Sequence, residues 1–287
     1  MSSSAAPRFE RLTLVVLWLF TAVALGGYAT VGLHPSLLAG VPNAASAYAA
    51  AFTFFPRAHI LLAFAVCVVV LGRRAGARWL PALAAVYLLS FGAELVGTTV
   101  GAPFGPYRYT DGLGVKWLGH VPVLIPLSWF FMATPSYLLA RRAIPAGVGP
   151  RRREVLGAVT GALVLLAWDL ALDPAMSHVT KYWVWLGEGS YYGMPASNLL
   201  GWYITGLALM TALGFARAHD WGAQLNSRWI AGFYFANLAL PLGMIGLSGL
   251  WGAVVVSALG VALSLSLPRL SWPRDRAARA ALAREVP

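Results

Sequence analysis

Charged residues are scarce in this chain. They make up 11% of its 287 residues, against roughly 25% in a typical soluble domain. Hydrophobic residues account for 59%, which excludes an ordinary soluble domain and indicates an integral membrane protein. The apolar segments run through the whole chain without a polar module between them, so we expect a single domain over residues 1–287 that ends in a basic cytoplasmic tail at 268–287.

Cysteine and lysine are also rare, and familiar cofactor motifs are missing. The single cysteine, Cys67, lies in an apolar run, which excludes a disulfide framework. There is no Cys/His cluster with zinc spacing and no glycine-rich phosphate-binding motif, so we expect neither a metal nor a cofactor. Both lysines, Lys116 and Lys181, fall in predicted connections, which argues against a retinal-binding photoreceptor, because that needs a lysine within a span.

Long apolar runs are abundant instead. A helix of about 20 residues crosses the apolar core of a bilayer, and the sequence predicts an all-α, polytopic transmembrane helix bundle of about eight spans. Residues 37–55 are rich in small side chains and form either an interfacial or re-entrant helix or an extension of the second span, so the count lies between seven and nine. The expected spans are about 12–33, 58–72, 79–98, 121–140, 154–173, 198–215, 229–247 and 250–267.

The net charge of +11 reflects membrane topology. Of the 21 basic residues, 17 precede the first span or follow an even-numbered one. Such an excess is typical of cytoplasmic connections and is favoured by anionic lipid of the inner leaflet. We therefore expect a multi-pass protein of the cell membrane with both termini cytoplasmic, whose partner is the lipid bilayer and not nucleic acid.

Three carboxyl groups lie near the outer ends of two spans. Glu94 lies about four residues inside the end of the third span, and the fifth span ends WDLALDP, with Asp169 and Asp173 one helical turn apart. Ionisable groups within a span are costly and usually mark a functional site. Two like charges on one helix face favour sharing a proton, which suits acid catalysis. Asp173 has a simpler alternative reading, since an Asp–Pro pair is typical of a helix exit.

The two longest outer connections follow these acids and are rich in aromatic residues. The string APFGP predicts an irregular loop, and irregular backbone at membrane depth is tolerated where it lines a cavity. Together the acids and aromatic rings suggest a pocket for an apolar polyene or isoprenoid. Aromatic faces stabilise a carbocation, so a carboxylic acid could protonate an alkene and water could quench the cation.

The stretches ELVGTTVGAPFGPYRYTDGLGVKWLGHVPVLIPLSW and WDLALDPAMSHVTKYWVWLGEGSYYGMPASNLLGW resemble the membrane carotenoid hydratases of the gamma-carotene 1′,2′-hydratase and bisanhydrobacterioruberin hydratase type. The resemblance covers roughly residues 91–202. It implies that water adds across the terminal double bond of a linear, ψ-end carotenoid and leaves a tertiary alcohol. The partners that the resemblance implies are the carotenoid substrate and water, and it also allows an association with other carotenoid enzymes.

The resemblance does not supply catalytic residues, so the roles follow from the chemistry. Glu94 or Asp169 is the expected general acid, and Asp173, or whichever acid stays ionised, handles the water. Asn198, His120 and His178 are candidates for holding water or relaying a proton, and Arg108 for pairing with an acid. The expected substrate-binding residues are Phe104, Tyr107, Tyr109, Trp183, Trp185, Tyr191, Tyr192 and Asn198.

Two other functions fit parts of the sequence. DxxxD resembles the aspartate-rich motifs with which prenyltransferases hold magnesium diphosphate, but such enzymes need two motifs and this chain has one. A lipid or carotenoid transport or binding protein would spread its polar residues through the membrane midplane, whereas here they gather on one side. Dependence on magnesium and a diphosphate substrate would identify the first alternative.

Overall fold

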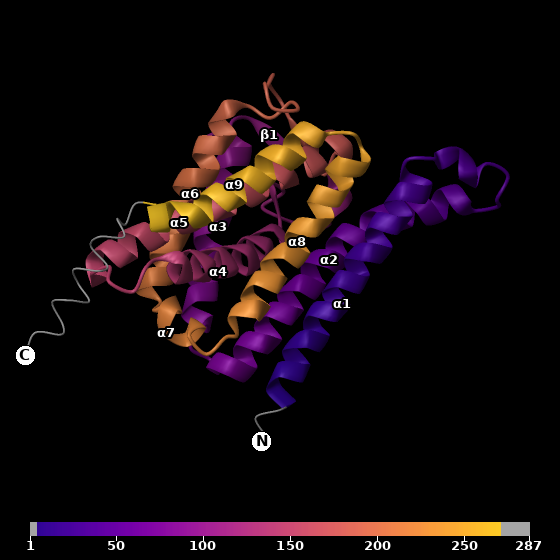
Figure 1. Cartoon of the computed structure of the whole chain (residues 1–287). Coiled ribbons are helices and arrows are strands. Elements are labelled where there is room, and N and C mark those ends of the chain that lie inside the picture. Colours follow the sequence, from indigo (N-terminus) through magenta and orange to yellow (C-terminus); the bar gives the residue numbers. More distant parts are fainter. Residues whose placement is uncertain (1–4, 271–287) are drawn as a thin grey trace, which may run out of the picture.

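The structure, a computed structural model, describes residues 5–270 as a bundle of long helices (Figure 1). Each of the eight predicted spans corresponds to one helix, which confirms the all-α polytopic fold class. Most of the predicted basic tail, residues 271–287, lies outside the described residues. The long helices are α1 (Ala5–Gly27), α2 (Ala44–Ala75), α3 (Leu80–Val100), α4 (Ile125–Ala143), α5 (Pro150–Asp173), α6 (Ala196–Phe215), α8 (Ser227–Leu247) and α9 (Trp251–Leu270).

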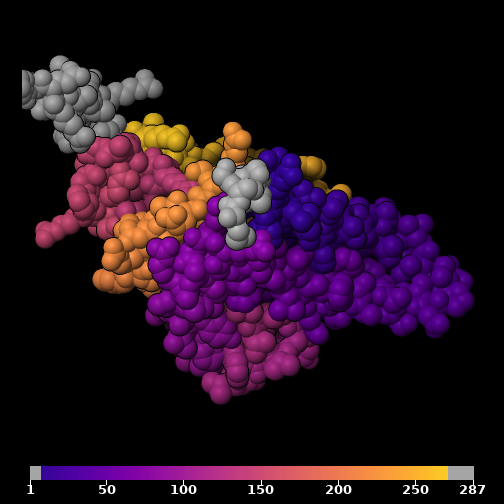
Figure 2. Space-filling view, turned by 90° about the horizontal axis from the view of Figure 1, so that it is seen from below, coloured from indigo at the N-terminus to yellow at the C-terminus, as the bar shows by residue number. Residues whose placement is uncertain are grey.

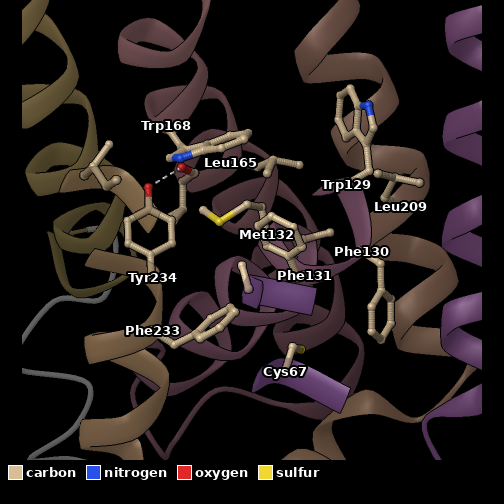
Figure 3. Packing of buried hydrophobic residues seen from close by; sticks show 14 of the residues in the cluster. Cys67, Trp129, Phe130, Phe131, Met132, Leu165, Trp168, Leu209, Phe233 and Tyr234 are labelled. Atoms are coloured by element: carbon tan, nitrogen blue, oxygen red, sulfur yellow. Dashed lines mark hydrogen bonds between the residues drawn. The ribbon is translucent and has the colours of Figure 1, made fainter. Parts of the chain in front are cut away.

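The centre of the bundle is α5, which packs against α4, α6, α8 and α9. Within the described part of the chain, seven helical segments are long and apolar enough to cross a membrane, and α4 is not among them. Most residues of α4 are buried, so helices rather than lipid surround it and it can be less apolar. Figure 3 shows this packing: Phe131 of α4 meets Phe233 of α8 edge to face, with ring centroids 6.2 Å apart.

The first two helices form a hairpin that extends past one end of the bundle (Figures 1 and 2). After α1 the chain continues through a π-helical turn, η1 (Tyr28–Gly32), and a short 3₁₀ helix, η2 (Pro35–Leu38). The ambiguous segment 37–55 largely joins the second span, because α2 begins at Ala44 and runs through Pro56 without a break. Of the two alternatives for this segment, extension of the second span is correct.

The two long connections after α3 and α5 meet at the end of the bundle. Strand β1 (Tyr107–Tyr109) pairs antiparallel with β4 (Trp183–Trp185), with Tyr107 opposite Trp185 and Tyr109 opposite Trp183. The first connection also contains η3 (Asp111–Leu113) and a small ladder of β2 (Lys116–Trp117) with β3 (Val121–Pro122). We call residues 101–124 and 180–195 together the lid.

The opposite end of the bundle carries short connections. Between α6 and α8 lies the five-residue helix α7 (Ala218–Gly222), which Figure 1 places near the start of α1 and away from β1.

Pro174 does not turn the chain out of α5. The helix continues as a π-helical turn, η4 (Pro174–Val179). Pro174 has no N–H to donate to the carbonyl four residues before it, and that carbonyl, of Leu170, accepts a hydrogen bond from the Tyr191 hydroxyl at 2.8 Å instead. The α-helix ends at Asp173, as the Asp–Pro pair indicates, but the chain does not leave the helical path there. Asp173 lies within a continuous helical segment, and its carboxylate points into the protein, where the residue is 2% exposed.

Candidate functional site

Beneath the lid lies a pocket, which we call the acid pocket, with about 860 Å³ of empty space including the solvent at its mouth. Its walls come from every long helix except α1 and α9, and from both strands of the β1–β4 pair. No lysine or arginine lines it within the described part of the chain. Its polar side chains are Glu94, Asp173, Asn198, Asn237, His59, Ser128, Tyr107 and Tyr109, and its other walls include Phe104, Trp129, Trp168, Trp183, Trp185 and Trp202.

The carboxylate of Glu94 is held by three neutral donors. The hydroxyls of Tyr107 and Tyr109 both donate to its Oε2, the latter at 2.8 Å, and the indole N–H of Trp129 donates to its Oε1 at 2.8 Å. Glu94 itself is 4% exposed. The carboxylate is thus fixed in orientation without a positive charge beside it.

Asp173 is held in the same manner on another wall. Its Oδ1 accepts hydrogen bonds from the Ser177 hydroxyl at 2.7 Å and the Trp185 indole at 3.1 Å. Its Oδ2 accepts longer ones from the Trp183 indole at 3.4 Å and the Asn198 amide at 3.3 Å. Indole N–H groups can only donate, so these partners suit an ionised, accepting carboxylate.

Asp169 lies one turn behind Asp173 and does not line the acid pocket. The Asn198 amide donates to Asp169 Oδ2 at 3.2 Å as well as to Asp173, and therefore joins the two aspartates. Asp169 is fully buried and its Oδ1 has no hydrogen-bond partner. A buried, unsatisfied oxygen is costly for a carboxylate, so this position suits a protonated acid behind the pocket.

Aromatic rings form the rest of the wall. Trp129 stacks on Trp202 with ring centroids 4.1 Å apart, and Trp168 meets Trp202 edge to face at 6.0 Å. Tyr107 packs against Trp185, with centroids 5.2 Å apart. A cation formed in this pocket would lie close to several π faces, which attract positive charge.

Two glycines let the lid approach the bundle closely. A Cβ at Gly97 of α3 would lie 2.8 Å from the ring of Phe104, and one at Gly201 of α6 would lie 2.6 Å from the same ring. Phe104 is therefore wedged between the two helices, which anchors the loop that carries Tyr107. Strand alternation then turns Tyr107 and Tyr109 inward together.

The surroundings of the two tyrosines keep them protonated. Burial, and after it the nearby carboxylate of Glu94, raises the pKa of both the Tyr107 and the Tyr109 phenol well above the usual value. Asp173 adds to the effect on Tyr107, so Tyr107 lies within the field of both pocket carboxylates. Both hydroxyls therefore remain available to donate to Glu94 at any physiological pH.

Besides Asp169, five predicted site residues lie outside the acid pocket. Alternation turns Arg108 to the exposed side of β1, so the expected pairing with a pocket acid is wrong. His120 and His178 are exposed, and neither faces the acids. Tyr191 donates to the Leu170 carbonyl at 2.8 Å, and Tyr192 packs on Tyr191 and His178, so these two tyrosines support the outside of the lid.

Three polar residues of the pocket wall, Ser128, His59 and Asn237, were not among the predicted site residues. His59 of α2 and Asn237 of α8 are both buried, and His59 Nδ1 and Asn237 Oδ1 have no hydrogen-bond partner. The sequence could have pointed to them, because His59 and Asn237 place an imidazole and an amide within apolar spans. Burial of such polar groups costs free energy unless they have a hydrogen-bond partner. They give the pocket unsatisfied polar atoms away from Glu94 and Asp173, where a water could bind.

The pocket is not arranged as a cation site. Across residues 5–270, no group of three or more His, Cys, Asp or Glu side chains could hold a metal ion. Indole and phenol donors already point at the oxygens of Glu94 and Asp173, where a cation would have to approach.

Comparisons with known proteins agree with these features. Residues 55–264 match the sequence model of a family described as "Carotenoid biosynthesis protein". The chain is 35% identical over 148 residues to the bisanhydrobacterioruberin hydratase of Haloarcula japonica, an alignment that covers 51% of this chain and 47% of that protein. The match thus spans about half the length of this relative. No solved structure matches the chain.

Proposed function

Because this chain belongs to the family of carotenoid biosynthesis proteins, we propose that it adds water to the terminal double bond of a linear carotenoid and forms a tertiary alcohol. The observation that carries this proposal is the acid pocket itself. It combines an apolar, aromatic wall with two carboxylates that face the same space and are held only by neutral donors.

Glu94 is the proposed general acid. Its partners Tyr107 and Tyr109 are hydroxyls, which can accept as well as donate, so a protonated Glu94 keeps a satisfied environment. In the first step Glu94 transfers its proton to one carbon of the terminal double bond, and this carbon becomes a CH₂ group. The π electrons of the double bond form the new C–H bond, and a tertiary cation remains on the neighbouring carbon.

The aromatic wall and Asp173 complete the addition. The cation lies against the indole rings of the pocket, among them Trp183 and Trp185, which stabilise it through their π faces. Water donates a hydrogen bond to Asp173 and attacks the cation through its oxygen, and Asp173 takes the released proton. Asn198 and the lid indoles hold Asp173 in position.

The cycle consumes only water. The proton on Asp173 returns to Glu94 through water in the pocket that both carboxylates line. Asp169 stays protonated behind the pocket and, through Asn198, orients its neighbour. No cofactor takes part in this scheme.

We place the protein in the cell membrane, with both termini cytoplasmic and the lid on the outer face. The bias of the basic residues supports this orientation. Reporter fusions after residue 110 and after residue 220 should give opposite signals, the first external and the second cytoplasmic. The same signal at both sites, or the reverse pair, would contradict the assignment.

Pigment analysis tests the proposed reaction. Cells that make a linear ψ-end carotenoid should accumulate, when they express this chain, a product heavier by one water. A matched strain expressing the Glu94→Gln, Asp173→Asn double variant should not. A carotenoid that purifies with the protein unchanged in mass would favour a binding protein instead, and activity that needs magnesium and a diphosphate would favour a prenyltransferase.

A further inference from the structure

A second pocket lies between the α1–α2 hairpin and the bundle. It has about 1350 Å³ of empty space including the solvent at its mouth, and we call it the apolar pocket. Its wall is formed by the end of α1 with η1, the following connection, the first half of α2, and parts of η4, the lid and α8. None of its lining residues is charged.

The two pockets share part of their walls. Pro56 of α2, Met176 of η4 and Leu240 of α8 line both the acid pocket and the apolar pocket. These three apolar side chains surround the boundary between the two spaces. On one side of it lie the carboxylates, and on the other side only uncharged groups.

Two tyrosine hydroxyls on the apolar pocket wall, those of Tyr28 and Tyr182, already have hydrogen-bond partners. The Tyr182 hydroxyl donates to the Phe52 carbonyl at 2.5 Å, and the Tyr182 ring stacks on Phe52 with centroids 5.2 Å apart. The Tyr28 hydroxyl is hydrogen-bonded to the Ser248 hydroxyl at 2.7 Å. What these residues leave for a ligand is ring surface, beside the small side chains of Ala47 and Ala51.

We propose that the apolar pocket binds the polyene chain of the substrate whose end group reacts in the acid pocket. This proposal rests on the proposed function. A linear carotenoid is a long, stiff, apolar rod, so an end group beneath the lid requires an apolar path for the rest of the molecule. The shared wall at Pro56, Met176 and Leu240 supplies that path, and a ring-lined, uncharged space continues it.

Two adjacent glycines near the end of α1 provide a matched test. Gly26 and Gly27 both have open space where a Cβ would lie, but only Gly27 lines the apolar pocket. Replacing a helical glycine is not expected to weaken the helix. Gly27→Phe therefore fills the apolar pocket, whereas Gly26→Phe adds the same ring beside it.

The readout is the hydration of two substrates with the same ψ-end, a full-length linear carotenoid and a short acyclic isoprenoid, each normalised to membrane-inserted protein. Gly27→Phe should lower the ratio of long to short product at least tenfold, while Gly26→Phe should keep the wild-type ratio. A wild-type ratio in Gly27→Phe, or an equal loss of both products, would overturn the proposal and would fit a pocket occupied by a membrane lipid.

A second pair of variants repeats the test from the facing helix. Ala51 lines the apolar pocket and Ala50, next to it on α2, does not. Ala51→Leu should lower the long-to-short ratio and Ala50→Leu should not, so the test does not depend on one variant accumulating. If the wild-type protein hydrates neither substrate, the proposed function fails first, and that outcome is distinct from an unchanged ratio.

Discussion

The carboxylates of the acid pocket accept hydrogen bonds from neutral groups, whereas the carboxylates at the other helix ends pair with arginines. Glu10 bonds Arg74 at 2.8 Å, Glu154 bonds Arg141 at 2.9 Å and Asp220 bonds Arg217 at 2.6 Å. All three pairs lie on the side that the sequence predicts to be cytoplasmic. Glu94, Asp173 and Asp169 instead receive only neutral hydroxyl, indole and amide donors.

This difference separates carboxylates that keep a charge from carboxylates that can exchange a proton. A fixed guanidinium favours the ionised form throughout and holds the acid in a structural role. Neutral donors orient a carboxyl group while leaving proton gain and loss open, as acid–base catalysis requires. Substitutions at the two kinds of site should therefore differ in what they affect, activity or structure.

The largest loss is expected from the two acids that face the acid pocket. Glu94→Gln and Asp173→Asn each preserve shape and remove the ability to exchange a proton, and a general acid or base typically contributes about 10²–10⁴-fold in rate. Hydroxycarotenoid yield, normalised to membrane-inserted protein, should fall by at least ~100-fold in each. Near-normal yield from either variant would remove that residue from the acid–base pair.

A smaller loss is expected from Asp169→Asn. Asp169 touches Asn198 but not the acid pocket, so it acts through the position of its neighbour. The yield should fall by about tenfold, equivalent to ~1.4 kcal/mol, and the pH profile of hydration should keep its shape. A profile shifted along the pH axis would instead make Asp169 a member of the acid–base pair.

Removing a single neutral donor should lower the rate of hydration by less than Asp169→Asn does. Trp129→Phe keeps a ring against Trp202 but removes the indole N–H that holds Glu94 Oε1. One lost hydrogen bond is worth about 0.5–1.5 kcal/mol, so we expect a decrease of a few-fold in the initial rate of hydration in isolated membranes. Phe130→Leu, beside it on α4 and outside the pocket wall, serves as the control, and an equal decrease there would assign the effect to packing.

The smallest effect is expected at the helix ends. Glu154 is 45% exposed on its side chain, and exposed ion pairs contribute roughly 0–1 kcal/mol. Glu154→Gln should therefore leave hydration per inserted protein unchanged, with at most a small decrease in thermal stability in detergent. A loss of activity as large as that of Glu94→Gln would abolish the distinction between the two groups of acids.

Much of the fold could be predicted because the membrane imposes simple rules. Runs of about 20 apolar residues predict spans, and all eight correspond to long helices. The cost of a buried carboxyl group identified the three acids that the structure brings together. What could not be predicted depends on packing between distant segments, such as the enclosure of α4, the helical path through Pro174, and the presence of His59 and Asn237 in the wall of one pocket.

The lid residues illustrate this limit most clearly. Composition alone could not separate Tyr107, which donates to Glu94, from Tyr191, which donates to the backbone at Leu170. The pairing of β1 with β4 makes the difference, and nothing in either segment taken alone specifies its partner. The same pairing turned Arg108 away from the acids that it was expected to meet.

That two-stranded ladder also makes the length of the lid loops a strict requirement. Side chains alternate with a period of two along a strand, so a shift of one residue exchanges the two faces. Deleting or inserting one residue between Phe104 and Tyr107 would withdraw both phenols from Glu94 and bring the guanidinium of Arg108 inward. A substitution in this stretch thus changes one contact of Glu94. A change in its length instead replaces both phenol donors with the guanidinium of Arg108.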